Sequence, residues 1–520
     1  MSHSRHRDTE RGQVGVQRGH KTQGRGADAE AKDKAGPDKR PNRRRPLCPK
    51  RRARGQRAAA RWVGNELDGL KLGHRKRLAR LIVVLTMMIL RPLRSVHDTF
   101  DDDAGSKAAY RLLDGDYLDP DAVRKTLRLA CVRRIGEQAL KRVLVLQDTT
   151  SFNYTTHRAA EGLGPLGDSD GSGGAGFFCH SLFAVTPDGV PLGLIDQFVW
   201  ARDPDAEQGR DDRRQRPIEE KESHRWIRAQ QVIQQAIPTD VEVVTIGDRE
   251  SDIYEFLAEP RPRNAYYLIR ACRERCLEDD TEKLWQKVRA SDSIGGYTFK
   301  VRELPRHRLR TVNVQVQMMT LTVKASTYGV RSDDAPSVRV TAIRVAEIDP
   351  PRKADAIDWL LLTNLPATTL DDAIECVGYY AKRWIIERFH FVLKSGCGME
   401  RAQLRTFERL HRLLVLYSVV AYRIMWMLYL ARVDPDLPCT AVFGDAEWRA
   451  LYYTTHDGAA PPDNPISLGH AIALLGALGG HKGRKCDGSP GAKVLWRGLS
   501  RLHQRIIGAA TIPPEIAGKA

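Results

Sequence analysis

Long apolar runs are missing from this chain of 520 residues, and so is a framework of cysteines. Its longest apolar stretches, near residues 81–90 and 413–422, are only about ten residues long, whereas a membrane-spanning helix requires about 18. We therefore expect no membrane span, and no secretion, because the N-terminus lacks an apolar signal core. The nine cysteines are scattered, and Cys272 and Cys276 have no second pair nearby. Reduced cytoplasmic thiols are expected rather than a zinc site.

Acidic residues are also in deficit. The chain has 83 Lys and Arg against 65 Asp and Glu, a formal net charge of +18, which favours a polyanionic partner, nucleic acid first. Much of the excess lies in residues 1–60, which hold 18 Lys and Arg but only 6 Asp and Glu. This segment has almost no apolar periodicity, so we predict a disordered basic tail. It either binds DNA non-specifically or is a solvated extension.

Residues 61–134 have the pattern of a small helical domain. A basic stretch containing Arg75, Arg77 and Arg80 leads directly into the apolar residues 81–90. An Asp-Pro-Asp sequence at 119–121 has the composition of a helix N-terminus. We predict a helical DNA-binding domain here, and the alternative is a plain helical cap on the following domain.

The rest of the chain predicts an α/β layer with an interruption. Short apolar runs indicate strands, and a Thr-Pro-Asp-Gly sequence at 186–189 predicts a hairpin turn. Strand-like alternation then continues over about residues 280–365, before a helix that carries Glu387 and ends at Gly396 and Gly398. Long helices are expected over 401–432 and a helical interaction region over 433–520. The predicted strands are 143–146, 177–185, 190–199, 241–246 and 265–269, with a helix at 219–236.

Three carboxylates stand at informative places in this pattern. Asp148 and Asp248 are each expected just beyond a buried strand, and Glu387 lies on the later helix. Strands that end on the same side of an α/β sheet meet at its carboxyl edge, where ligands bind. Three acids meeting there repel one another unless divalent cations hold them, and hard oxygen ligands select Mg²⁺ or Mn²⁺. Two such ions can flank a phosphodiester.

The helix that carries Glu387 adds basic and aromatic partners. At about 100° per residue, Tyr380, Arg383, Glu387 and Lys394 fall within an arc of roughly 60° on one helix face. An acid among fixed positive donors suits a metal ion beside a phosphate. Each acid also has a simpler interpretation. Asp148 can begin a turn, Asp248 can cap a helix, and Glu387 can pair with Arg383; taken together, the acids favour the functional interpretation.

Three sequence blocks carry a family resemblance. They are residues 147–154, residues 247–254, and the spacing Tyr380-x2-Arg383-x3-Glu387-x6-Lys394. With these blocks the chain resembles the insertion-sequence-four group of DDE transposases, typified by the transposase of transposon five. The resemblance extends over about residues 61–515, and its third block is the most specific.

The resemblance implies an architecture and an activity. It implies an α/β ribonuclease-H-like core over 135–432, with the β-rich insertion at about 280–365 before the last catalytic helix, between helical N- and C-terminal domains. Two Mg²⁺ ions, replaceable by Mn²⁺, would be held by Asp148, Asp248 and Glu387. The enzyme would nick transposon ends, form a hairpin and transfer strands into target DNA. Its partners would be terminal inverted repeats, target DNA and a second copy that dimerises through residues 433–520, in the bacterial cytoplasm at the nucleoid.

The resemblance also implies DNA contacts. Tyr380, Arg383 and Lys394 match residues that grip the terminal phosphates. Trp359 matches a tryptophan on which a flipped base stacks, although the three leucines after it also suit a core position. Arg270 matches a basic residue of the active site.

Other positions stand near this set or depart from it. Trp384 and His390 lie beside the predicted polar face and either contact DNA or border the core. Phe391 stands where the transposon-five enzyme has a lysine, which removes one phosphate contact. His74 and Arg75 replace an Asp-Pro in the DNA-reading segment, so Arg75, Arg77 and Arg80 are expected to read different ends.

Two further functions compete with transposition. One is a ribonuclease-H-like nuclease that cuts without joining, and the other is an inactive product that binds the ends as a repressor. Short inverted repeats on both sides of the gene would favour transposition over either alternative.

Overall fold

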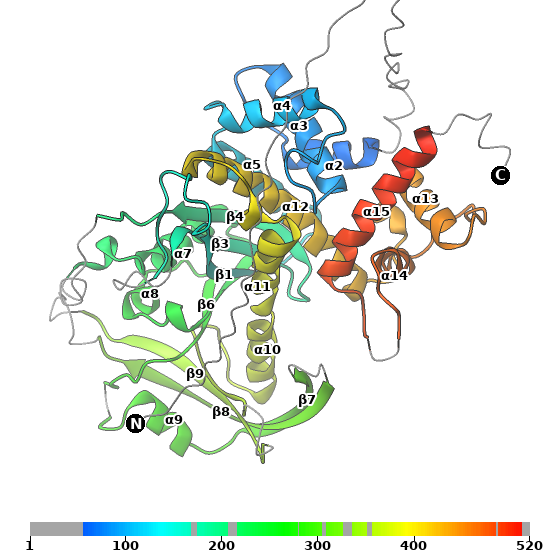
Figure 1. The fold of residues 1–520 in the computed structure, drawn as a ribbon. Helices are drawn as coiled ribbons and strands as arrows, with labels where there is room; N and C mark the ends of the chain where they lie inside the picture. The colour runs from blue at the N-terminus through cyan, green and yellow to red at the C-terminus, as the bar shows by residue number, and fades with distance from the viewer. Residues whose placement is uncertain are drawn as a thin grey trace, which may run out of the picture. The chain divides into compact units, whose positions relative to one another are not determined.

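A computed structural model describes residues 56–511, except for 168–173, 206–215, 279, 304–307, 326–334, 351–355 and 485–486. The tail predicted over residues 1–60 falls outside the described part up to residue 55. The described part is a mixed α/β structure with a large sheet and a helical C-terminal region (Figure 1).

The N-terminal segment is helical, as predicted. Helix α2 begins at Arg57, four residues before the expected domain boundary. Helix α4 begins at Asp103, because the side chain of Asp102 accepts a hydrogen bond from the Gly105 N–H. Asp119 caps α5 in the same way and Pro120 occupies its first turn, as the Asp-Pro-Asp sequence predicts. The helices are α2 (Arg57–Glu66), α3 (Arg75–Leu90), α4 (Asp103–Asp114) and α5 (Pro120–Glu137).

One sheet of ten strands organises the described residues, in the order β2-β3-β1-β5-β6-β10-β9-β8-β7, with β4 paired to β3. Strands β1, β5 and β6 are parallel to one another, and the predicted hairpin is the antiparallel β3–β4 pair. Gly189 in its turn has a φ of +94°, a conformation that favours glycine. The strands are β1 (Arg142–Asn153), β2 (Gly164–Pro165), β3 (Ala175–Val185), β4 (Pro191–Trp200), β5 (Glu242–Gly247), β6 (Ala265–Arg270), β7 (Gly295–Glu303), β8 (Arg308–Val323), β9 (Val338–Glu347) and β10 (Asp358–Thr363).

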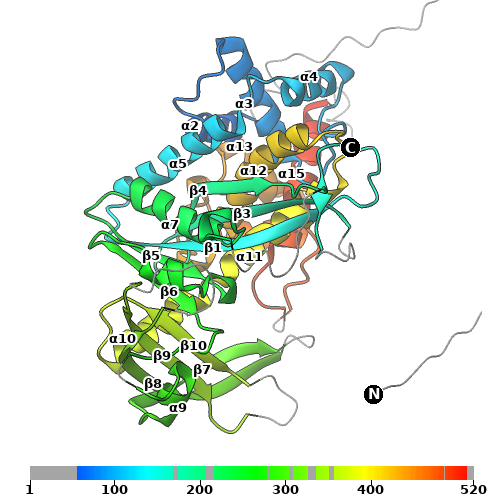
Figure 2. The ribbon, with the colours of Figure 1, turned by 90° about the vertical axis from the view of Figure 1, so that its left-hand side faces the viewer.

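Helices cover both faces of the sheet around β1, so its residues alternate between two apolar cores. Val143 and Val145 pack in one core with residues of α5 and of α7 (His224–Ala236). Leu144 and Leu146 pack in the other, with residues of α11 (Trp384–Phe391) and α12 (Phe407–Val433). Figure 2 shows α7 and α11 near β1. This alternation decides which side chains near the end of β1 can meet α11.

The strands β7 to β10 lie in the chain between β6 and α10 (Leu370–Ala381) and extend the sheet as antiparallel neighbours. A short helix, α9 (Leu284–Ala290), precedes β7, so the region of strand-like alternation is not purely β. Helix α10 has a complete capping box from Thr369 and Asp372.

The prediction of one continuous helix from Tyr380 to Lys394 is wrong. Helix α10 ends at Ala381, α11 begins at Trp384, and Val392–Gly396 form a π-helical turn. At the break, the N–H groups of Lys382 and Arg383 donate to the carbonyls three residues earlier, which tightens the turn. After α11, the N–H group of Cys397 donates to the carbonyl of Val392, five residues earlier, which widens the turn. Because both changes alter the rotation per residue, the single arc calculated from 100° steps does not apply.

The C-terminal region is helical. Helix α12 is long and apolar enough to cross a membrane by length and composition, with a mean hydropathy of 1.8 over its most apolar window, but 83% of that window is buried inside the protein. It is therefore a core helix, and its end packs with α13 (Asp445–Thr455), α14 (Leu468–Leu478) and α15 (Ala492–Thr511) in one apolar cluster.

Candidate active site

The first carboxylate lies inside a strand, not after one. Strand β1 continues through Asp148 to Asn153 because β3 pairs with it over this whole length, with Asp148 opposite Ser181. Its parallel pairing with β5 ends earlier, at Leu146. Asp148 therefore stands where β1 leaves its parallel neighbour, and the turn considered from the sequence does not form.

Asp248 directly follows β5 and lies beside Asp148. Leu146 of β1 is in register with Ile246 of β5, and both pack in the core shared with α11, so the two aspartates two residues further on face the same side. Asp248 also caps a short 3-10 turn, accepting a 2.8 Å hydrogen bond from the Glu250 N–H. Burial raises the pKa of Asp248 to about 6, and the negative charge of Asp148 adds to the rise.

Arg383 connects the three acids. Its guanidinium makes a 2.5 Å ion pair with Glu387 one turn later, as the simpler interpretation of Glu387 expects. It also interacts electrostatically with Asp148 and Asp248. The three sequence-distant carboxylates thus lie within the field of one arginine, at the carboxyl edge of β1 and β5 and the start of α11.

The fit of this site to divalent cations can be judged from its donors. Carboxylate oxygens are suitable ligands, and the unfavourable closeness of Asp148 and Asp248 is relieved by a cation. In the described part of the chain, however, no three Asp, Glu, His or Cys side chains are placed to hold one ion together. The chemistry of the donors therefore fits a divalent cation, but their arrangement here does not bring three ligands to one ion, and Glu387 is paired with Arg383.

A second cluster joins three of the predicted DNA contacts. The ring of Tyr380 meets Trp359 edge-on with 5.4 Å between centroids, and the Arg270 guanidinium lies 5.7 Å from the Trp359 ring centre. Tyr380 is only 5% exposed, so it does not present its phenol on an open polar face as predicted. Burial raises the pKa of Tyr380 and lowers that of Arg270. Trp359 is partly buried against the main core, so its predicted core contacts exist.

The remaining residues of the third block lie in different surroundings. Lys394, in the π-helical turn, lies 5.7 Å from the ring centre of Phe152 and 4.0 Å from Glu400. Trp384, at the start of α11, is 51% exposed. Phe391 packs against Trp496 of α15, with ring centroids 5.7 Å apart, so an aromatic contact occupies the position of the missing lysine.

The arginines that are predicted to recognise the transposon ends lie on α3, away from the elements that carry the acids. Arg75, Arg77 and Arg80 are exposed on the first turns of α3, whose N-terminus is capped by His74. Arg77 donates to the Leu72 carbonyl and stacks 4.2 Å from the Tyr117 ring centre. These side chains are on the N-terminal helices, whereas the acids are on β1, β5 and α11.

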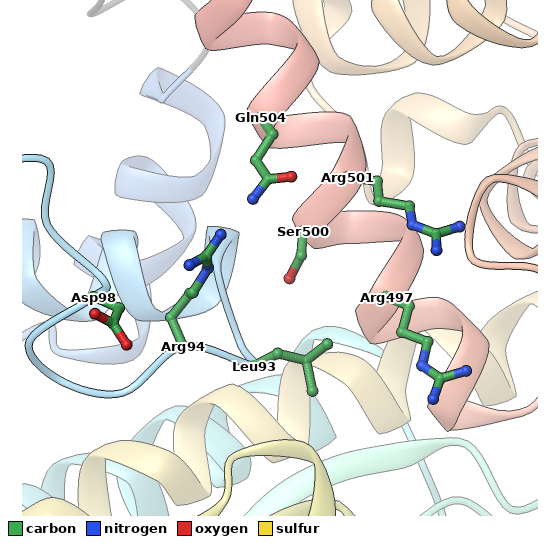
Figure 3. A pocket seen from close by; sticks show the side chains of 7 residues that line it. All are labelled: Leu93, Arg94, Asp98, Arg497, Ser500, Arg501 and Gln504. Carbon is green, nitrogen blue, oxygen red and sulfur yellow. The ribbon is translucent and has the colours of Figure 1, made fainter.

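In the described part of the chain, the four most pronounced cavities are not lined by Asp148, Asp248 or Glu387. One of about 610 Å³ lies between the loop carrying Arg94 and Asp98 and the helix α15, from which Ser500 and Gln504 point toward Arg94 (Figure 3). Another, of about 450 Å³, opens on the α7 side of β1 beside Thr149.

Sequence reasoning placed His390 beside the site without assigning it a contact. In the structure its Nδ1 lies 3.5 Å from the Asp148 carboxylate. Its spacing of three residues from Glu387 on a helix was the available signal. Ser181, which bonds the same ring, was not singled out, and no local pattern marks it.

Three segments of the chain match known protein families. Residues 222–423 match the transposase DDE domain, a segment that includes Asp248 and Glu387 but begins after Asp148. Residues 59–117 match the transposase DNA-binding domain. The chain is therefore a DDE transposase, an enzyme that cleaves DNA and transfers strands with the help of divalent metal ions. Residues 419–512 match the dimerisation domain of Tn5 transposase, and the chain belongs with the Tn5-like members of this family.

Proposed function

We propose that this transposase works by a cut-and-paste mechanism on the inverted repeats of its own element, with Asp148, Asp248 and Glu387 as the catalytic acids. The observation that carries the assignment is the position of Arg383, which is paired with Glu387 and interacts with both aspartates. The sheet around β1 would be a ribonuclease-H-like core, with β7 to β10 inserted before the catalytic helix.

Two Mg²⁺ ions, or Mn²⁺ in their place, would be held by the same three carboxylates. When bound, such ions supply charge stabilisation to a phosphodiester under in-line attack. The chain contributes the rest: Asp148 and Asp248 fix one side of the site from adjoining strands, and Glu387 completes it once Arg383 moves to a DNA phosphate. A phosphate is a suitable new partner because arginine forms paired, charge-assisted hydrogen bonds with it.

The DNA strand would run along the surface that these residues share. Arg383, Arg270 and Lys394 would bind its terminal phosphates. Trp384 is well placed to stack on an unpaired base because half of its side chain is exposed. Trp359 and Tyr380 would hold Arg270 in place and would contact a base that is flipped out of the duplex. Stacking of a base on an aromatic ring tolerates any sequence and contributes on the order of 1–3 kcal/mol.

Recognition of the ends would lie elsewhere. Arg75, Arg77 and Arg80 on α3 would contact the terminal repeats, within a DNA-binding domain at 61–134, and residues 433–520 would form the dimer contact. Each subunit of the DNA-bound homodimer would then act on an end held by the other, at the bacterial nucleoid in the cytoplasm, with target DNA joined afterwards. Between cutting and joining, the transposon ends would pass through a hairpin intermediate.

The proposal is tested by product analysis. Full-length protein is incubated with labelled duplexes of its element ends, a target plasmid and Mg²⁺, and the DNA is resolved on denaturing gels. We expect nicked, hairpin and joined products in sequence. Nicks without joining would favour a nuclease, and binding without nicks a repressor. Glu387→Gln is the control: it should bind the ends as the parent does and yield no nicks, and nicking at the parental rate would refute the assignment.

A further inference from the structure

His390 and Ser181 form a bridge around the first carboxylate. Asp148 and Ser181 are opposite each other on β1 and β3, so their side chains project from the same face of the sheet. The His390 ring comes from α11 and contacts both: Nδ1 lies 3.5 Å from Oδ2 of Asp148, and Nε2 lies 3.1 Å from Oγ of Ser181. One ring thus joins two strands to the helix that carries Glu387.

The bridge continues into the protein as a chain of hydrogen bonds. Gln197 of β4 donates through Nε2 to Oγ of Ser181 at 3.2 Å, and its Oε1 is 2.9 Å from the Ser418 hydroxyl on α12. A consistent direction follows from these partners. Ser181 accepts from Gln197, and its other neighbour, the Cys179 sulfur at 3.6 Å, is a weak acceptor. The Ser181 hydroxyl can therefore donate to Nε2 of His390, which places the ring proton on Nδ1, facing Asp148.

The chain is deeply buried along its whole length. His390 is 5% exposed, Gln197 is 1% exposed, and Ser181 and Ser418 are fully buried. Buried polar groups are costly unless they are paired, so a satisfied chain of this kind holds one orientation. Its outer end is the carboxylate of Asp148, the point where the buried chain meets the site.

We propose that His390 is a positioning residue for the transposase reaction: its Nδ1–H, fixed by Ser181 and Gln197, holds the Asp148 carboxylate in the orientation that binds a divalent cation. The inference rests on the proposed role of Asp148 as a metal-binding acid. The 3.5 Å separation is at the outer limit of a hydrogen bond, and contacts of this kind tighten when a site binds its ligands.

Two substitutions of His390 distinguish the contribution of Nδ1 from that of Nε2. In His390→Asn the amide nitrogen replaces Nδ1 and can reach Asp148, whereas in His390→Gln it replaces Nε2 and reaches only Ser181. A matched control is His180→Gln. His180, on β3, is a buried histidine like His390, but it bonds Gln147 and Thr149 on the opposite face of β1.

The experiment measures Mn²⁺ binding to full-length protein on duplex element ends, by titration with electron paramagnetic resonance of the free ion. We expect His390→Gln to raise the Mn²⁺ dissociation constant by about 10–100-fold, as loss of a partner behind a metal ligand does. His390→Asn and His180→Gln should stay within about threefold of the parent, since both keep the Asp148 contact. The midpoint of thermal unfolding is recorded for every variant.

Each other outcome is informative. Parental affinity in both His390 variants would overturn the proposal, and so would an equal loss in both with unchanged unfolding, because ring volume would then matter instead of Nδ1. Asp148→Asn separates this failure from that of the proposed function. If Asp148→Asn itself binds Mn²⁺ like the parent, the assignment of the acid is wrong, whatever His390 does.

Discussion

The second half of β1 presents two faces that are built alike. On the α11 face, Asp148 lies 3.5 Å from His390 and interacts electrostatically with Arg383, which pairs with Glu387. On the α7 face, Thr149 meets His180 and Arg225, and Arg225 pairs with Glu250 at 2.6 Å.

Each face therefore has a strand residue, a buried histidine and an arginine–glutamate pair, and a cavity of about 450 Å³ even opens beside the α7 face. On the α11 face the strand itself contributes a carboxylate, Asp148, and Asp248 follows the adjoining strand. On the α7 face the strand contributes Thr149, and the carboxylates there, Glu222 and Glu250, are each paired with an arginine. A polar network beside a strand is therefore ordinary support, and a carboxylate on the strand itself, next to Asp248, distinguishes the candidate active face.

The largest expected difference between the faces concerns the strand residues themselves. Asp148→Asn should lower the nicking rate by about 10³-fold or more, since several kcal/mol of charge stabilisation are lost. Thr149→Val, on the other face, should stay within about threefold. Single-turnover nicking with bound DNA measures both, and equal losses in the two variants would erase the distinction.

The two arginines give the next contrast. Arg383→Gln should lower strand cleavage by about 10–100-fold, because a charge-assisted hydrogen bond to phosphate contributes about 1.5–3 kcal/mol. It should also tighten Mn²⁺ binding by the DNA-free protein, because the substitution removes the guanidinium charge that competes with Mn²⁺ for the three acids. Arg225→Gln should change neither quantity appreciably. Weaker Mn²⁺ binding in Arg383→Gln would contradict the view that this guanidinium stands among the three acids.

The raised pKa of Asp248 predicts a pH effect on the metal-free protein. An acid with a folded pKa of about 6, against an ordinary 3.8, binds more protons in the folded state between these values. Its contribution to stability is therefore fully present below about pH 4 and is lost as the pH rises through 6, on the order of 2–3 kcal/mol in total. Asp248→Asn should remove this trend, as measured by urea unfolding between pH 4 and 7. An unchanged slope would indicate that Asp248 is solvated.

The smallest effect is expected for the competing glutamate. Glu250 lies two residues after Asp248 and also raises its pKa, so it is a rival third acid. Its side chain is 61% exposed, and exposed ion pairs such as Arg225–Glu250 contribute at most about 1 kcal/mol. Glu250→Gln should thus nick DNA at nearly the parental rate, and a loss comparable to that of Glu387→Gln would exchange the two assignments.

Much of this arrangement was predictable because it depends on local pattern. The runs at 143–146 and 241–246 form parallel strands in register, so a spacing of 100 residues places Asp148 and Asp248 side by side. The hairpin at 186–189 followed from its turn residues. These features depend on alternation and on backbone preference, which a sequence displays directly.

The failures have tertiary causes. Neither proline nor glycine marks the break between α10 and α11, where the buried ring of Tyr380 packs on Trp359. The extension of β1 past Asp148 comes from pairing with β3. The contact of His390 with Asp148 joins residues 242 positions apart, so no window of sequence contains it.

The central claim is that Asp148, Asp248 and Glu387 hold the divalent ions that the reaction needs, and a change of metal preference tests it most directly. Each acid is replaced in turn by cysteine, whose softer thiolate binds Mn²⁺ more readily than Mg²⁺. Nicking of element ends is then measured with either ion. The account predicts no nicking by the cysteine variants with Mg²⁺ and recovery with Mn²⁺, whereas nicking with Mg²⁺ at the parental rate in any of the three would contradict it.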